Sequence, residues 1–79
     1  MVNLVEALAE YAHEAWSGWM RYLFSKSVVN EDGSVTIPRE FVARWARQMD
    51  TPYHKLPENE KESDREEARK MLEITGLEE

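Results

Sequence analysis

The chain has 79 residues, a formal charge of −6, three tryptophans and no cysteine. A chain of this length makes one domain, residues 1–79, with a small core and neither a disulfide nor a thiolate metal site to supplement it. The acidic balance argues against nucleic-acid binding, and no hydrophobic run approaches the roughly 18 residues of a membrane span. No basic-then-apolar signal segment opens the chain, so we expect a cytoplasmic protein that has no membrane partner.

Residues 3–25 are predicted to form the first helix. Asn3 is a good N-cap, and Glu6 complements the helix dipole. One face collects apolar residues at three- and four-residue spacing: Leu4, Leu8, Tyr11, Ala12, Ala15, Trp19 and Leu23. The opposite face carries glutamates, whereas interfacial membrane helices usually carry basic residues there. Trp16 and Trp19 are therefore expected to pack in the core, with a partner interface as the alternative.

Two features of this helix lie outside that pattern. Met20 and Phe24 form a narrower apolar edge, next to His13, with no obvious contact inside the chain. Such an edge predicts self-association into a homo-oligomer. Gly18 costs a helix about 1 kcal/mol relative to alanine, and close approach by another helix is the expected reason for it.

A β-hairpin and a second helix are predicted to follow. Asp32-Gly33 between β-branched residues indicates a hairpin within residues 27–37, with an irregular loop as the alternative. Pro38 suits the start of the next helix, which extends to about Met49. Pro52 then ends it, because the residue before a proline is displaced from helical geometry.

The last third of the chain is predicted to be an extended segment followed by a third helix. Residues 53–56 are expected to be extended, and Pro57 opens a helix that ends near Thr75, with Gly76 as its C-terminal cap. Residues 63–66 fit a capping box, so a short turn followed by a separate helix from Ser63 is an alternative.

The predicted fold is mainly α, a small three-helix domain with a short β-hairpin or loop between the first two helices. Ala68, Met71 and Leu72 should close the third helix over a core that consists of Leu8, Trp19, Leu23, Phe41 and Trp45. Tracing the stripe of the third helix backward leads to Asp64 and Arg65. Charged residues on an inward face are costly unless they are paired or used, so this pair marks the candidate site.

The residues predict neither a metal site nor an enzyme. His13 and Glu14 lack the second histidine, four residues on, that a helical zinc site needs, because that position is Ser17. No activated nucleophile stands beside a base, and the glycines are isolated rather than grouped in a phosphate loop. We therefore expect no catalytic residue, no metal and no cofactor.

A binding site for a phosphorylated ring is the more specific expectation. Tyr53 and Trp45 supply aromatic faces, and Arg44, Arg47 and Arg65 supply guanidinium groups, the residue types that stack a base and hold phosphates. A structural alternative stays open. Arg65 could instead pair with Asp64 or with a glutamate of the first helix, while Tyr53 covers the edge of the core.

Residues 52–68 resemble the second half of the ryanodine-receptor repeat (RyR) domain. That half reads proline–aromatic, two residues, Leu-Pro-Glu, a short spacer, Lys-Glu-Ser-Asn-Arg and then an alanine, against Pro52-Tyr-His-Lys-Leu-Pro-Glu-Asn-Glu-Lys-Glu-Ser-Asp-Arg-Glu-Glu-Ala68 here. His13-Glu14 matches a histidine–acid pair in the first helix of that family. The tryptophan that usually follows the proline is Tyr53 in this chain.

The chain also looks like small hypothetical proteins of tailed bacteriophages and prophages. The sequence segments that they share are Trp16-Ser-Gly-Trp-Met20, Asp32-Gly-Ser34, Arg44-Trp-x-Arg-Gln-Met49 and Glu60-Lys-x-Ser-Asp-Arg65. The resemblances imply a non-enzymatic module of the bacterial host cytoplasm that binds a nucleotide-derived ligand, such as a host immune signal.

Under that interpretation each candidate residue has a role. Tyr53 stacks a ring, and Arg65 with Arg44 or Arg47 holds phosphate. His13 or Asp64 fixes the orientation of the ligand.

A second functional hypothesis uses the charge of the third helix. Residues 57–79 hold nine acids against four bases. This segment could instead bind a basic surface of another protein, where it would imitate the charge of a nucleic acid. The two hypotheses are a ligand-binding module and an acidic protein-interaction module.

Overall fold

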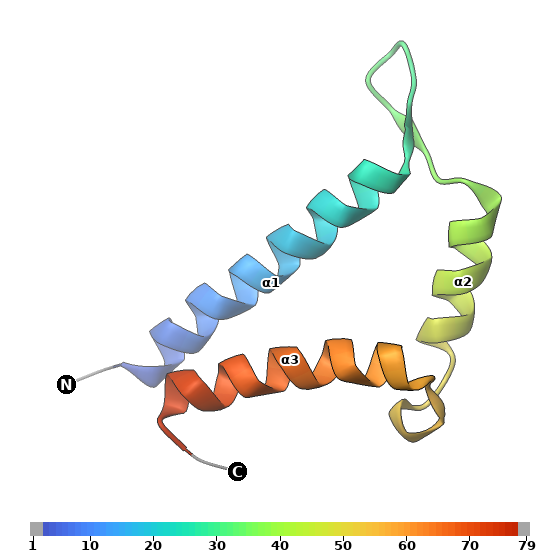
Figure 1. Cartoon of the computed structure of the whole chain (residues 1–79). Coiled ribbons are helices and arrows are strands. Elements are labelled where there is room, and N and C mark those ends of the chain that lie inside the picture. The colour runs from blue at the N-terminus through green and yellow to red at the C-terminus, as the bar shows by residue number, and fades with distance from the viewer. Residues whose placement is uncertain (1–2, 78–79) are drawn as a thin grey trace.

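The computed structural model of the chain describes residues 3–77 and has the predicted fold class (Figure 1). Three helices are present, with a two-stranded hairpin between the first two and a short 3-10 turn before the third. In chain order the elements are α1 (Leu4–Lys26), β1 (Val28–Val29), β2 (Val35–Thr36), α2 (Arg39–Met49), η1 (Tyr53–Lys55) and α3 (Glu58–Thr75).

The ends of α1 follow local hydrogen-bonding rules. The side-chain oxygen of Asn3 accepts from the Glu6 N–H at 3.2 Å, which confirms the predicted N-cap. At the other end the Ser27 hydroxyl donates to the carbonyl of Leu23 at 2.8 Å. The backbone of Ser27 is extended, and the β-branched residue that follows starts β1.

The predicted hairpin is confirmed and extends away from the helices (Figure 1). The strands are antiparallel, with Val28 opposite Thr36 and Val29 opposite Val35. The turn is held by Asp32, whose carboxylate accepts from the hydroxyl and the N–H of Ser34 at 2.6 and 3.0 Å.

The corner between α2 and α3 corrects one expectation. Tyr53 to Lys55 are not extended, because the carbonyl of Pro52 accepts from the Lys55 N–H at 2.9 Å and the carbonyl of Tyr53 accepts from the Leu56 N–H at 3.0 Å. Leu56 alone has the expected extended backbone. The resulting 3-10 turn satisfies backbone groups that an unpaired extended segment would leave to solvent. Pro38 and Pro57 likewise stand just before their helices, as N-caps.

Helix α3 is continuous through Ser63, so the two-piece alternative for this region is wrong. The helix ends at Gly76, whose φ of 76° is the left-handed conformation that glycine adopts without a Cβ penalty. The C-terminal cap predicted from sequence is thereby confirmed.

The three helices form an open, flat frame rather than a packed bundle (Figure 1). The chain measures 49 × 33 × 16 Å with a radius of gyration of 16.0 Å, against about 12 Å for a compact domain of this length. Among the described residues only Leu56 and Glu60 are buried. The start of α1 and the end of α3 approach each other, and the two helices diverge from there (Figure 1).

This open frame overturns the predicted core. Trp19 is half exposed, Met71 is exposed to a similar degree, and Ala68 is exposed. Helix α3 therefore does not close over the other two helices through that stripe. The predicted apolar stripes are present on the helices, but within one chain they do not pack against one another to form a core.

Two sets of contacts hold α2 in the frame. An aromatic series joins it to α1, because the Trp45 ring lies 6.1 Å from Tyr22 and 5.4 Å from Phe41, measured between ring centroids. Near the C-terminal end of α2 the Arg47 guanidinium donates two hydrogen bonds to the carboxylate of buried Glu60, with Nη2–Oε2 at 2.7 Å and Nη1–Oε1 at 3.4 Å. Hydrogen bonding to Glu60 raises the pKa of Arg47.

The bidentate pair generates the first prediction. Arg47→Met should lower the melting temperature clearly, because it leaves the Glu60 carboxylate buried without its partner. Arg44→Met is the matched control, one turn earlier on α2 at a residue for which the described structure records no ion pair, and it should have little effect. Far-UV circular dichroism melts measure both. Equal melting temperatures for the two variants would contradict the structural role of the pair.

Candidate functional site

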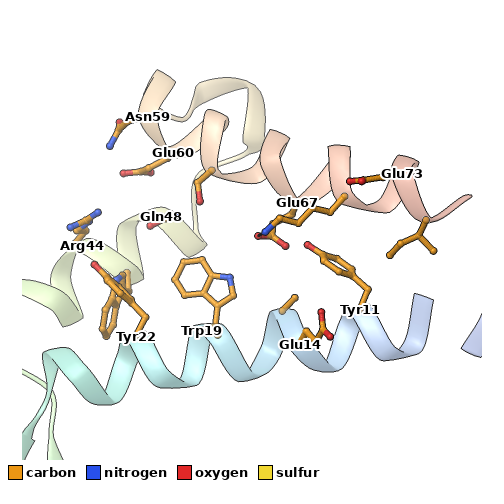
Figure 2. A pocket seen from close by; sticks show the side chains of 16 residues that line it. Tyr11, Glu14, Trp19, Tyr22, Arg44, Gln48, Asn59, Glu60, Glu67 and Glu73 are labelled. Carbon is orange, nitrogen blue, oxygen red and sulfur yellow. Dashed lines mark ion pairs between the residues drawn. The ribbon is translucent and has the colours of Figure 1, made fainter. Parts of the chain in front are cut away.

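The inside of the frame holds a groove with a volume of about 710 Å³ (Figure 2). We call it the frame groove. Its walls come from α1, α2 and α3, and it is lined by Tyr11, Glu14, Ala15, Gly18, Trp19, Tyr22, Arg44, Trp45, Gln48, Asn59, Glu60, Ser63, Glu67, Lys70, Glu73 and Ile74. The volume lies within the range of about 300–1,000 Å³ that is typical of ligand sites.

The frame groove combines aromatic surface with unbalanced negative charge. Its lining includes four aromatic rings, four carboxylates and two cations. Glu60 is held by a guanidinium from α2, and Lys70 Nζ lies 3.8 Å from a carboxylate oxygen of Glu67. Within the described residues no ion pair is recorded for Glu14 or Glu73, so the groove has carboxylates available to an incoming cation.

Tyr11 and Gly18 mark the wall that α1 contributes. The Tyr11 hydroxyl is buried and has no hydrogen-bond partner among residues 3–77, a state that costs roughly 1–3 kcal/mol. No other part of the described structure lies within 4 Å of the position that a Cβ on Gly18 would take. The expectation that another helix approaches Gly18 is therefore wrong, and the glycine opens onto the groove instead.

A second, more apolar cavity lies at the corner where α1, α2 and η1 meet. We call it the corner pocket. Its volume is about 550 Å³, and it is lined by Trp19, Leu23, Trp45, Gln48, Met49, Thr51, Tyr53, Leu56 and Asp64. Asp64 is the one charged side chain in this lining. The structure thus brings Tyr53 and Asp64, two of the predicted site residues, to one pocket.

Of the other predicted site residues, Arg65 interacts with the side chain of Tyr53 at that pocket, whereas Arg44, Arg47 and His13 lie apart from it. Arg44 lines the frame groove. Arg47 is engaged with the buried carboxylate of α3. His13 is exposed and stacks against Trp16 with 6.1 Å between ring centroids, and it lines neither cavity.

Arg65 is held by its own helix. Its Nη1 donates to Glu58 at 3.1 Å and to Glu62 at 3.3 Å. The structural alternative expected Asp64 or a glutamate of the first helix as the partner of Arg65, and the structure corrects this expectation. Arg69 donates to the other oxygen of Glu62 at 2.7 Å. Hydrogen bonds to Glu58 and then Glu62 raise the pKa of Arg65, and the arginines in turn lower the pKa of both carboxyl groups.

The aromatic ring of Tyr53 also has a neighbour of its own. The ammonium group of Lys61 lies 5.9 Å from the centroid of that ring, within the range of a cation–π contact. A stacking ligand would therefore have to share the ring with Lys61 or displace it.

Sequence reasoning missed the residues that make the frame groove a candidate site. Tyr11 and Gly18 are seven residues apart, which places both on one helical face, and this spacing was the available signal. Glu67 and Glu73 gave no comparable signal, because charges on a predicted surface helix are ordinary.

Residues 3–77 contain no group of three or more histidines and carboxylates placed to hold a metal ion, and no helix among them is long and apolar enough to cross a membrane. Comparison with known protein families, curated proteins and solved structures finds no match to this chain. The RyR resemblance therefore stays a prediction from the motif.

The charge network of α3 generates the second prediction. The pKa values of Glu58 and Glu62 are lower in the folded chain than their usual 4.5, so the stability that they contribute is fully present above about pH 4.5. That contribution is lost as the pH falls through the lowered values. Thermal melts at decreasing pH should show this loss, and Glu62→Gln should reduce its size. Glu31→Gln, in the hairpin, is the control, and an equal reduction in both variants would contradict the network.

Proposed function

We propose that this chain is a non-enzymatic binding module that captures a basic amphipathic segment of another protein in the frame groove. The observation that carries the proposal is the pairing of aromatic walls with an excess of carboxylates in one groove. Of the two functional hypotheses, the geometry supports the protein-interaction module better.

The chemistry of such a segment matches the groove. Aliphatic or aromatic side chains of the segment would pack on Trp19 and Tyr22. Its lysines or arginines would lie near Glu14, Glu67 and Glu73, which flank Tyr11 in Figure 2. A polar group of the partner would also form a hydrogen bond with the buried Tyr11 hydroxyl, which would make the free energy of binding more favourable.

Gly18 supports the same proposal. A glycine in the middle of a helix is destabilising, and here no neighbouring group needs the space that its missing side chain leaves. An occupant of the groove would use that space, because it lets a partner approach the α1 backbone closely.

A nucleotide-derived ligand has less support. It would lie in the corner pocket, where Tyr53 and the two tryptophans could stack a ring. Its phosphates would meet Asp64 there, and Arg65 would have to leave both of its glutamates to reach them. The frame groove itself is acidic and repels an anion.

The third prediction tests the acidic rim. A helical peptide of lysine and leucine, patterned with one basic and one apolar face, should bind and change the intrinsic tryptophan fluorescence, and added salt should weaken its binding. The double charge reversal Glu67→Lys with Glu73→Lys should weaken binding by roughly tenfold or more. Glu31→Lys, in the hairpin and outside the groove, should bind as the parent chain does.

Two outcomes would contradict the proposal. One is equal affinity for a peptide of the same composition whose faces are scrambled. The other is a melting temperature that rises with cyclic nucleotides or ADP-ribose isomers but not with the amphipathic peptide, which would favour the nucleotide-derived ligand.

The fourth prediction separates binding from folding at Gly18. Gly18→Ala should raise the free energy of unfolding by about 1 kcal/mol, because alanine has the higher helix propensity and meets no neighbour. Gly18→Leu should also keep the helix, but its side chain fills the groove and should abolish peptide binding. Chemical denaturation and the fluorescence titration measure the two effects. Unchanged peptide affinity in Gly18→Leu would exclude this groove as the binding site.

A further inference from the structure

An apolar seam runs along α1 on a face that shares only Trp19 with the frame groove. Its residues alternate at four- and three-residue spacing over three heptads, the repeat by which helices pair. The α1 seam consists of Val5, Ala9, Ala12, Trp16, Trp19 and Leu23. Trp19 lies at its border with the frame groove and Leu23 at its border with the corner pocket.

Most of this seam is uncovered within one chain. Val5 is 74% exposed, Trp16 is 60% exposed and Trp19 is 51% exposed, and both alanines are exposed as well. Soluble monomers rarely leave two adjacent tryptophans of one helix face in water. Met20 and Phe24, the edge for which sequence predicted self-association, lie beside the seam.

The surface area of the whole chain indicates what covers the seam. The chain exposes 6604 Å², whereas a compact monomer of 9.3 kDa exposes about 5,000 Å². The excess is roughly 1,600 Å² per chain and belongs to the open frame as a whole, of which the seam is one part. A specific interface of standard size buries about 800 Å² on each partner. A second copy that covers the seam therefore needs only about half of this excess, and the frame groove stays open.

The side chains of the seam are complementary in size when two copies run antiparallel. In that register Val5 faces Leu23, Ala9 faces Trp19 and Ala12 faces Trp16 of the other copy. Each tryptophan thus meets an alanine, the alternation of large and small side chains that fills a core. A parallel pair would instead oppose tryptophan to tryptophan and alanine to alanine.

The helix dipoles favour the same direction. In an antiparallel pair the N-terminus of each α1 lies beside the C-terminus of the other, so the two dipoles attract each other.

We propose that two copies of this chain form an obligate homodimer through antiparallel packing of their α1 seams. The contact runs from Val5 to Leu23, about 27 Å at 1.5 Å per residue. Because Leu23 and Trp19 also line the corner pocket, the start of each α1 reaches the corner pocket of the other copy. The dimer does not depend on the proposed peptide binding, since Trp19 is the only seam residue that lines the frame groove.

Sedimentation equilibrium and circular dichroism test the seam. The parent chain should be a dimer at micromolar concentration. Ala12→Glu places a charge where Trp16 of the other copy packs, and it should give either a monomer or a loss of helix at the same concentration. Ala43→Glu is the matched control, at an exposed alanine of α2, and it should stay dimeric and helical. A monomeric parent chain, or a fully dimeric Ala12→Glu variant, would overturn the proposal.

Disulfide trapping tests the orientation, because the natural chain has no cysteine. Val5→Cys and Leu23→Cys, each oxidised alone, should give little cross-linked dimer, since equivalent residues lie far apart in an antiparallel pair. An equal mixture of the two variants should cross-link efficiently. Efficient cross-linking of either variant alone, with none added by mixing, would show a parallel pair and refute the proposed arrangement.

Discussion

The frame depends on a single buried charge. Glu60 is one of two buried residues in the described chain, and its carboxylate is held in a bidentate contact by Arg47. Because an unpaired buried carboxylate is costly, this contact fixes how α2 meets α3 at the corner that Leu56 fills. The corner in turn holds the start of α3 away from the second half of α1 (Figure 1). A frame held open in this way has a groove inside it rather than a core.

Local signals in the sequence were sufficient for the elements of the fold. The Asn3 cap, the Asp32-Gly33 hairpin and the Gly76 cap are confirmed because each depends on hydrogen bonds or dihedral angles within a few residues. The prediction of an extended segment over residues 53–56 is wrong for Tyr53 to Lys55 and holds only at Leu56, for a related reason. A proline restricts the backbone of the residue that precedes it. The 3-10 turn here forms instead from the backbone N–H groups of Lys55 and Leu56, which follow Pro52 in the chain.

The packing and the site could be predicted only in part. An apolar stripe shows that one face of a helix must be buried, but it does not show whether the same chain buries it. The predicted core therefore includes Trp16 and Trp19, which one copy of the chain leaves exposed. Tyr53 and Asp64 do share a pocket. Arg65 is bound by Glu58, seven residues earlier on the same face of α3, a longer separation than the three- and four-residue spacings that predict helical ion pairs.

The frame groove and the α1 seam lie on different faces of α1 that share Trp19. This arrangement affects the affinity of the chain for a basic partner. Pairing through the seam would provide the apolar burial that one open frame lacks, while leaving Tyr11 and Gly18 facing the frame groove. Each dimer would then carry two acidic grooves related by twofold symmetry. A partner with two basic segments could fill both, and the second contact would form at the effective concentration that the linker sets. Loss of the seam would then weaken capture of such a partner far more than capture of a single peptide.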